Sequence, residues 1–280
     1  MIPDILLDAL LDTLKTVPFL FAAFLALEAL EHYSGGLSNR LLEKAGKAGP
    51  FFGAVLGCIP QCGFSVASAN LYSGGVISLG TLIAVFIATS DEAILIMLGN
   101  PGSGAAVLRL LICKVIAGII IGFAVDFIFR KHKNEKSIED LCRGRGCGCS
   151  DDSGILRPAV RHTWKLAVYI LVFNIILGFV LETAGTDTLS ALLGKDTLYQ
   201  PFLAALMGLI PNCAASVMIT ELYLADILGF PAAMAGLAAG AGVGLAVLFR
   251  ENRPMRENFE ILGILYVSAA LVGVVLELLI

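Results

Sequence analysis

The chain has 280 residues, of which 58% are hydrophobic and only 15% are charged, and its mean hydropathy is +0.87. A soluble domain has about 45–50% apolar and about 25% charged residues. This composition therefore excludes most soluble enzymes and indicates an all-α polytopic membrane protein. The formal net charge of −4 provides no basic field, which argues against binding to nucleic acid.

Six stretches are predicted to be ordinary transmembrane helices, which need about 20 mostly apolar residues. They are Leu14–His32, Val76–Leu98, Ala105–Phe129, Leu166–Glu182, Phe230–Phe249 and Phe259–Ile280. The polar connections 34–48, 130–165 and 250–257 carry most of the Lys and Arg residues, so the positive-inside rule places them in the cytoplasm. We therefore expect a multi-pass protein of the cell membrane with both chain ends outside.

Two further apolar stretches, Pro50–Tyr72 and Pro201–Tyr223, are each interrupted by an Ile-Pro-polar-Cys motif. Proline breaks a helix interior, but it suits the first turn of a new helix, and glycine suits the end of the preceding one. Each stretch is predicted to form two half-helices of roughly 15 Å, which reach the middle of the bilayer. An even number of crossings keeps the basic loops on one side, so each unit is a re-entrant hairpin or a pair of crossings. A single kinked helix is the alternative.

These two stretches are copies of each other at an offset of 151 residues, with 11 identities in 23 positions. Each half of the chain has one span, one broken unit and two further spans, which makes an odd number of crossings. The sequence therefore predicts an inverted 5+5 repeat, with a first repeat at 1–129, a cytoplasmic loop at 130–158 and a second repeat at 159–280. Such repeats are typical of secondary transporters, whose site lies at mid-membrane between the repeats.

The residues around the two breaks are the predicted substrate site. They are Cys58, Pro60, Gln61, Cys62 and Ser65 in the first repeat and Pro211, Asn212, Cys213 and Ser216 in the second. Thiol ligands prefer thiophilic metals to Mg²⁺, Ca²⁺ or Mn²⁺. The N-termini of the half-helices also attract anions, so an oxyanion or a neutral hydroxide such as arsenous acid fits as well. Inert packing is the alternative for the cysteines, above all for Cys58, whose counterpart is Leu209.

Coupling is predicted to involve Asp91 and Glu92, which interrupt the span 76–98. Acids at bilayer depth cost about 2.5–3.5 kcal/mol each on insertion scales, so they usually face a cavity or a partner. Lys114 and Arg109 lie at a similar depth on the next span. The expected arrangement is a proton-coupling cluster, or a static ion pair that holds two helices together.

Two further groups of residues are weaker candidates. Asn70 and Glu221 occupy equivalent repeat positions, and Glu221 is either a second coupling acid or a solvated charge. Three cysteines in the polar loop stay reduced in the cytosol and do not have zinc-finger spacing. They either capture a thiophilic ion or belong to a plain linker: Cys142, Cys147 and Cys149.

The motifs GCIPQCGFS at 57–65, SDE at 90–92 and IPNCAAS at 210–216 resemble those of the ten-helix heavy-metal exporters. That family is also described as arsenic efflux permeases, and some of its members are labelled manganese transporters. The resemblance covers nearly the whole chain apart from the loop at 130–158. It implies an exporter of a thiophilic metalloid or heavy metal, of the arsenite or organoarsenical type.

The combined expectation is a proton-coupled secondary transporter that works by alternating access, with no enzymatic activity and no cofactor. No nucleotide-binding motif is present in the sequence. The expected partners are a small inorganic or organometalloid substrate, protons and the lipid bilayer. The sequence does not decide whether copies of the chain form a homo-oligomer. Three alternatives are a manganese or other divalent-cation carrier, an oxyanion carrier, and an intramembrane thiol oxidoreductase that uses Cys58 and Cys62. The divalent-cation carrier would be built on Asp91, Glu92, Asn70 and Glu221.

Overall fold

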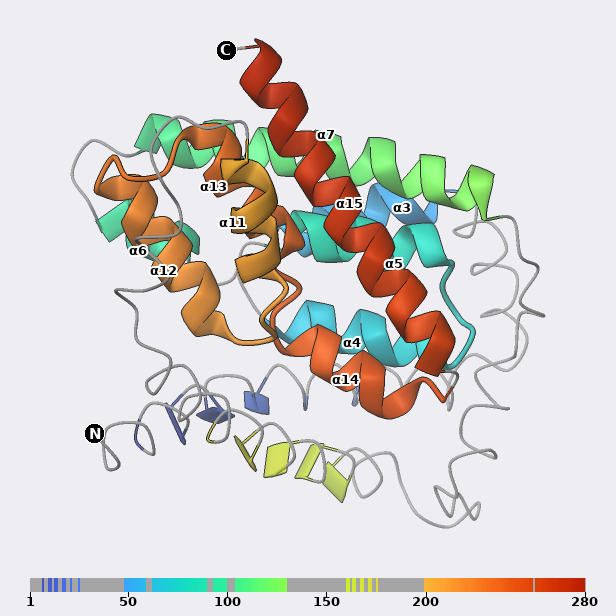
Figure 1. Ribbon diagram of the computed structural model, residues 1–280. Coiled ribbons are helices and arrows are strands. Elements are labelled where there is room, and N and C mark those ends of the chain that lie inside the picture. The colour runs from blue at the N-terminus through green and yellow to red at the C-terminus, as the bar shows by residue number, and fades with distance from the viewer. Residues whose placement is uncertain are drawn as a thin grey trace.

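The computed structural model describes residues 48–58, 62–89, 93–99, 104–129, 199–253 and 255–279, together with isolated helical positions between 7 and 25 and between 160 and 175. All regular structure in these residues is α-helical (Figure 1). The predicted spans Leu14–His32 and Leu166–Glu182 lie outside the described residues, apart from the isolated positions. The predicted loop at 130–158 also lies outside them.

Five helices of the first half recur in the second half. The first set is α3 (Gly49–Gly57), α4 (Cys62–Ser73), α5 (Leu79–Ala88), α6 (Ala93–Gly99) and α7 (Gly104–Ile128). The second set is α11 (Gln200–Gly208), α12 (Cys213–Leu224), α13 (Phe230–Ala239), α14 (Val243–Glu251) and α15 (Met255–Leu279). Each helix begins 151 residues after its counterpart, except α14, which begins 150 residues after α6. The repeat in the sequence is therefore a repeat of secondary structure.

The turns that end α4 and α12 have the same conformation. Val76 N donates to Leu71 O at 2.9 Å, and Ile227 N donates to Leu222 O at 3.0 Å. This is the six-residue closing bond of a Schellman turn, which needs a residue with positive φ. Gly75 (φ 78°) fills that position in the first repeat and Asp226 (φ 55°) fills it in the second. The repeat thus extends to backbone torsion angles.

Replacing Asp226 with glycine is expected to stabilise the protein by about 0.5–1 kcal/mol, because glycine adopts positive φ without the steric cost that a Cβ imposes. The melting temperature in detergent should rise by roughly 1–4 °C. The matched control is the reverse exchange, Gly75→Asp, at the equivalent turn, which should lower the melting temperature. A fall in melting temperature for Asp226→Gly would contradict this reading of the turn.

The N-terminus of α5 is held on α7 by a carboxylate. Ser78 caps the helix by accepting a hydrogen bond from Thr81 N at 3.1 Å. Asp126 of α7 accepts hydrogen bonds from Ser78 Oγ and from Gly80 N, each at 2.7 Å. A negative charge there satisfies free N–H groups and complements the helix dipole. These contacts fix the position of α5 relative to α7.

Small residues bring three helices of each repeat into close contact. A Cβ on Gly122 of α7 would lie 2.8 Å from Pro50 Cβ and 2.9 Å from Ala84 Cβ. A Cβ on Gly273 of α15 would lie 2.7 Å from both Pro201 Cβ and Ala235 Cβ. Close approach at small residues is how helices pack in membranes, where no hydrophobic force drives them together. The same three-helix packing, α3–α5–α7 and α11–α13–α15, is therefore built twice.

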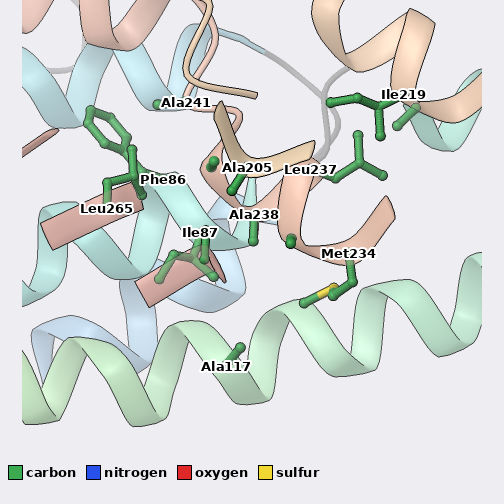
Figure 2. Packing of buried hydrophobic residues seen from close by; sticks show 14 of the residues in the cluster. Phe86, Ile87, Ala117, Ala205, Ile219, Met234, Leu237, Ala238, Ala241 and Leu265 are labelled. Atoms are coloured by element: carbon green, nitrogen blue, oxygen red, sulfur yellow. The ribbon is translucent and has the colours of Figure 1, made fainter. Parts of the chain in front are cut away.

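Helices α5 and α13 form the centre of the molecule, and α7 and α15 form its outer surface. Every residue of α13 is buried, as is every residue of α5 except Leu79. Most of their side chains meet those of the neighbouring helices in the main apolar core (Figure 2). In contrast, α7 exposes an apolar stripe made of Leu108, Ile112, Ile116, Ile120 and Phe127. An exposed stripe of this kind on a 25-residue helix suits contact with lipid.

Three helical segments are long and apolar enough to cross a membrane: Gly104–Ile128, Phe230–Glu251 and Met255–Leu279. Together with the all-helical architecture, they identify a polytopic membrane protein, as the composition predicts. The two outer helices, α7 and α15, correspond to the predicted spans Ala105–Phe129 and Phe259–Ile280.

The two repeats contact each other through pairs of helices that exchange their roles. Helix α4 packs on α14, and its counterpart α12 packs on α6, the counterpart of α14 (Figure 1). Likewise α5 packs on α15 and α13 packs on α7, while α5 and α13 pack on each other. Each repeat therefore offers the same surfaces to the other.

Candidate functional site

The first pair of helix breaks lies where the Ile-Pro-polar-Cys motifs predict it. Helix α3 ends at Gly57 and α4 begins at Cys62, while α11 ends at Gly208 and α12 begins at Cys213. Residues 59–61, which include Pro60 and Gln61, lie outside the described residues. In the second repeat Pro211 is half-buried and Asn212 is buried, and Asn212 N donates to Ile210 O at 2.7 Å.

A second pair of breaks interrupts Val76–Leu98 and Phe230–Phe249, which the sequence predicts to be ordinary transmembrane helices, although Phe230–Glu251 is still long and apolar enough to cross a membrane. Helix α5 ends at Ala88, where Thr89 turns to extended backbone (φ −58°, ψ 128°), and α6 begins at Ala93. Helix α13 ends at Ala239, and α14 begins at Val243 after Gly242, whose φ is 53° and ψ is −145°. Only glycine adopts this conformation readily. The three glycines Gly240, Gly242 and Gly244 are the feature of the sequence that indicates this break. Each repeat thus contains two interrupted helices instead of one.

The breaks within each repeat lie next to each other. A Cβ on Gly57, at the end of α3, would lie 2.8 Å from Val85 O and 3.0 Å from the Cβ of Ala88, at the end of α5. A Cβ on Gly208, at the end of α11, would lie 3.1 Å from the Cβ of Ala239, at the end of α13. The C-terminal ends of two half-helices therefore come together in each repeat.

The first turns of α4 and α12 both meet the break between α13 and α14. Ser65 of α4 is wholly buried, and a Cβ on Gly244 of α14 would lie 2.7 Å from Ser65 Cβ. Ser216 of α12 is also buried, and a Cβ on Gly240 would lie 3.4 Å from Ser216 Oγ. The Ser65–Gly244 contact joins the two repeats. Two predicted site residues thus lie at one of the two breaks that the sequence reasoning missed.

This arrangement concentrates partial charges of both signs. Helices α3, α5, α11 and α13 end here, and α4, α12 and α14 begin here. The last carbonyl groups and the first N–H groups of a helix lack the regular intrahelical partner. Each helix end carries roughly half an elementary charge, negative at the C-terminus and positive at the N-terminus. Broken helices in membrane transporters use both kinds of end to hold ions and charged substrates.

Lys114 is the predicted coupling residue that the structure places at these breaks. The side chain, on α7, is 0% exposed. Its ammonium donates to Thr89 O, at the end of α5, and to Leu237 O of α13 at 2.8 Å. Its predicted partners Asp91 and Glu92 lie outside the described residues. Arg109 lies elsewhere, with its guanidinium 4.3 Å above the centre of the Phe230 ring.

Of the three candidate cysteines, the structure describes the side chain of one and only the backbone of the other two. Cys58 follows the last residue of α3, is half-buried, and lies within electrostatic range of the Lys114 ammonium. Cys62 and Cys213 are the first residues of α4 and α12, and their side chains are not among those described. Among the described side chains, no three His, Cys, Asp or Glu residues form a group that could hold a metal ion. A three-thiol ligand set stays a prediction, and the loop residues Cys142, Cys147 and Cys149 lie outside the described part.

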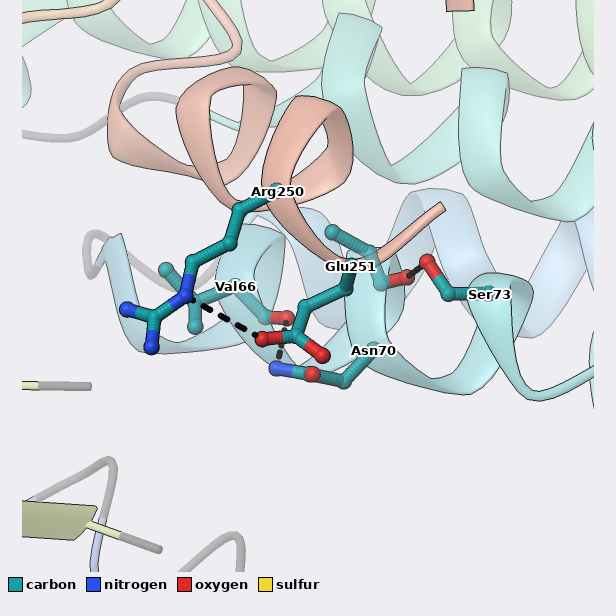
Figure 3. Close-up of polar contacts among 6 residues, drawn as sticks. Val66, Asn70, Ser73, Arg250 and Glu251 are labelled. Carbon is teal, nitrogen blue, oxygen red and sulfur yellow. Dashed lines mark hydrogen bonds and ion pairs between the residues drawn. The ribbon is translucent and has the colours of Figure 1, made fainter. Parts of the chain in front are cut away.

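Asn70 and Glu221 are not brought to the breaks by the described structure. Asn70 Nδ2 donates to Val66 O of its own helix at 3.1 Å, near the Arg250–Glu251 ion pair of α14 (Figure 3). Glu221, its counterpart, is exposed near the end of α12. These positions favour a solvated charge for Glu221 over a coupling acid.

The comparison with known protein families matches almost the entire chain. A family model described as "Putative, 10TM heavy-metal exporter" matches residues 2–184 and 161–279. No curated protein and no solved structure matches the chain.

Proposed function

This chain belongs to the ten-transmembrane heavy-metal exporter family, and from that premise we propose that it exports a thiophilic metalloid or heavy metal by proton-coupled alternating access. The substrate class we propose is trivalent arsenic, as arsenite or an organoarsenical. The observation that carries the proposal is the position of the cysteines. A cysteine is the first residue of each of two equivalent half-helices, α4 and α12, whose first turns both lie at the break between α13 and α14.

Alternating access is supported by the exchanged helix contacts between the repeats. When α4 packs on α14 and α12 packs on α6, each repeat offers the other the same surface, as a two-fold axis requires. We infer from the odd number of crossings that the sequence predicts for each repeat that this axis lies in the membrane plane and that the second copy is inverted. Rocking of one repeat against the other then exposes a central site to each side in turn.

A thiophilic substrate is supported by the chemistry around the breaks. Sulfur ligands bind soft metals and metalloids in preference to hard cations. The buried Lys114 ammonium near Cys58 is a hydrogen-bond donor with no lone pair, so it cannot be a ligand to a divalent cation. Of the residues proposed for a manganese carrier, Asn70 is bonded within its own helix and Glu221 is exposed. The oxygens of a neutral arsenic hydroxide, in contrast, can accept a hydrogen bond from an ammonium.

An oxyanion carrier is a second candidate, and it is favoured by the same ammonium. Lys114 and the N-terminal ends of α4 and α12 would together stabilise a negatively charged substrate. The two candidates differ in whether the cysteines are needed for transport.

Uptake of substrate into inside-out membrane vesicles tests the proposal. Vesicles that contain the protein should accumulate arsenite or methylarsenite when a proton gradient is imposed, and a protonophore should abolish the accumulation. Vesicles without the protein are the control, and phosphate and Mn²⁺ are assayed in parallel. Accumulation of phosphate alone would replace the proposal with an oxyanion carrier, and accumulation of Mn²⁺ alone would replace it with a divalent-cation carrier.

A further inference from the structure

The buried Lys114 side chain connects the C-terminal ends of two half-helices that belong to different repeats. Its ammonium donates to Thr89 O, the residue that follows α5, and to Leu237 O, in the last turn of α13. Ala241 N, the usual i+4 partner of Leu237 O, donates to Ala239 O instead at 2.9 Å. The end of α13 therefore presents a carbonyl that the ammonium binds from another helix.

Two helix C-termini directed at one point make a favourable position for a cation. Each end contributes about half a negative charge and carbonyl groups without intrahelical partners. In secondary transporters with broken helices, such ends and the unwound carbonyls beside them coordinate the coupling cation. Here the position is filled by an ammonium that is covalently part of the chain, in a region where the surrounding side chains are buried.

We propose that the Lys114 ammonium occupies an inter-repeat cation site in place of a free metal ion, so that the protein needs neither Na⁺ nor K⁺. The hydrogen bond from Lys114 to Leu237 O joins the first repeat to the second. It is released and re-formed when the repeats move against each other. This last role in the transport cycle rests on the proposed function, whereas the cation site itself does not.

Chemical rescue of Lys114→Ala tests the cation site directly. The substitution keeps Cβ and removes three methylene groups and the ammonium, which together correspond to n-propylammonium. In detergent, n-propylammonium chloride should raise the melting temperature of Lys114→Ala by a few degrees relative to choline chloride at the same concentration. The wild-type protein should show no such difference.

Leu110→Ala is the matched control, because Leu110 is also buried on α7, one turn earlier, and carries no charge. Its cavity is apolar, so n-propylammonium should not stabilise this variant relative to choline. If n-propylammonium raises the melting temperature of both variants equally, or of neither, the proposal is wrong.

A second measurement uses the wild-type protein and does not depend on folding of the alanine variant. The melting temperature should be the same in NaCl, KCl and N-methylglucamine chloride at equal ionic strength, and Lys114→Arg should retain this independence. A specific stabilisation by Na⁺ or K⁺ would overturn the proposal. If these melting results hold but vesicles transport none of the substrates assayed, the proposed function fails while the ammonium site stands.

Discussion

Replacing Gly244 with alanine is expected to lower transport at least tenfold and to destabilise the protein by about 1–3 kcal/mol, the range for inserting a methyl group into a packed core. The added Cβ would lie 2.7 Å from Ser65 Cβ, 2.8 Å from Ser65 C and 2.9 Å from Ser65 O. Two of these atoms belong to the backbone, so rotation of a side chain cannot relieve the clash. Helix α14 must move away from α4, which separates the two repeats at the candidate site.

The matched control is Gly263→Ala on α15, where an added Cβ would have nothing within 4 Å. That exchange should leave transport unchanged and stabilise the protein by up to about 1 kcal/mol, because alanine favours a helix more than glycine does. Thermal unfolding in detergent and vesicle uptake measure the two effects. Equal behaviour of the Gly244→Ala and Gly263→Ala variants would show that the contact between α4 and α14 is not tight.

The combined replacement Cys62→Ser and Cys213→Ser is expected to reduce the transport of trivalent arsenicals by more than about 10–100-fold. That range is typical for removing even an outer-shell partner of a metal ligand, and here the ligands themselves are changed. Serine is nearly the same shape but offers a hard oxygen in place of a soft sulfur. Vesicle uptake of arsenite and methylarsenite, with melting temperature as a check on folding, measures the effect.

Two further exchanges make this prediction specific. Cys113→Ser, at another free and half-buried cysteine on α7, should leave transport unchanged. Cys58→Ser should have a smaller effect than either member of the repeated pair, because Leu209 stands at the equivalent position of the second repeat. Normal arsenical transport by the Cys62/Cys213 double variant would exclude the thiol site and leave the oxyanion carrier as the better hypothesis.

The membrane class, the repeat and the first pair of breaks were all predictable from the amino-acid sequence. Composition decides the class because the bilayer requires long apolar helices. The breaks at Gly57–Cys62 and Gly208–Cys213 were predictable because proline acts locally, by removing a donor and clashing with the preceding turn. The repeat was visible because equivalent residues recur at one offset, and the helix bounds follow that offset.

Two features were decided only by the tertiary structure. The break between α13 and α14 depends on Gly242, but a glycine within an apolar stretch also fits close helix packing, so the sequence did not distinguish the two roles. Two partners of the Lys114 ammonium are backbone carbonyls, one of them 123 residues away. Every residue carries such a carbonyl group, so no pattern of side chains points to them. The ends of the half-helices decide which carbonyls lack an intrahelical partner. The packing of the two repeats decides which of those carbonyls face the same buried ammonium.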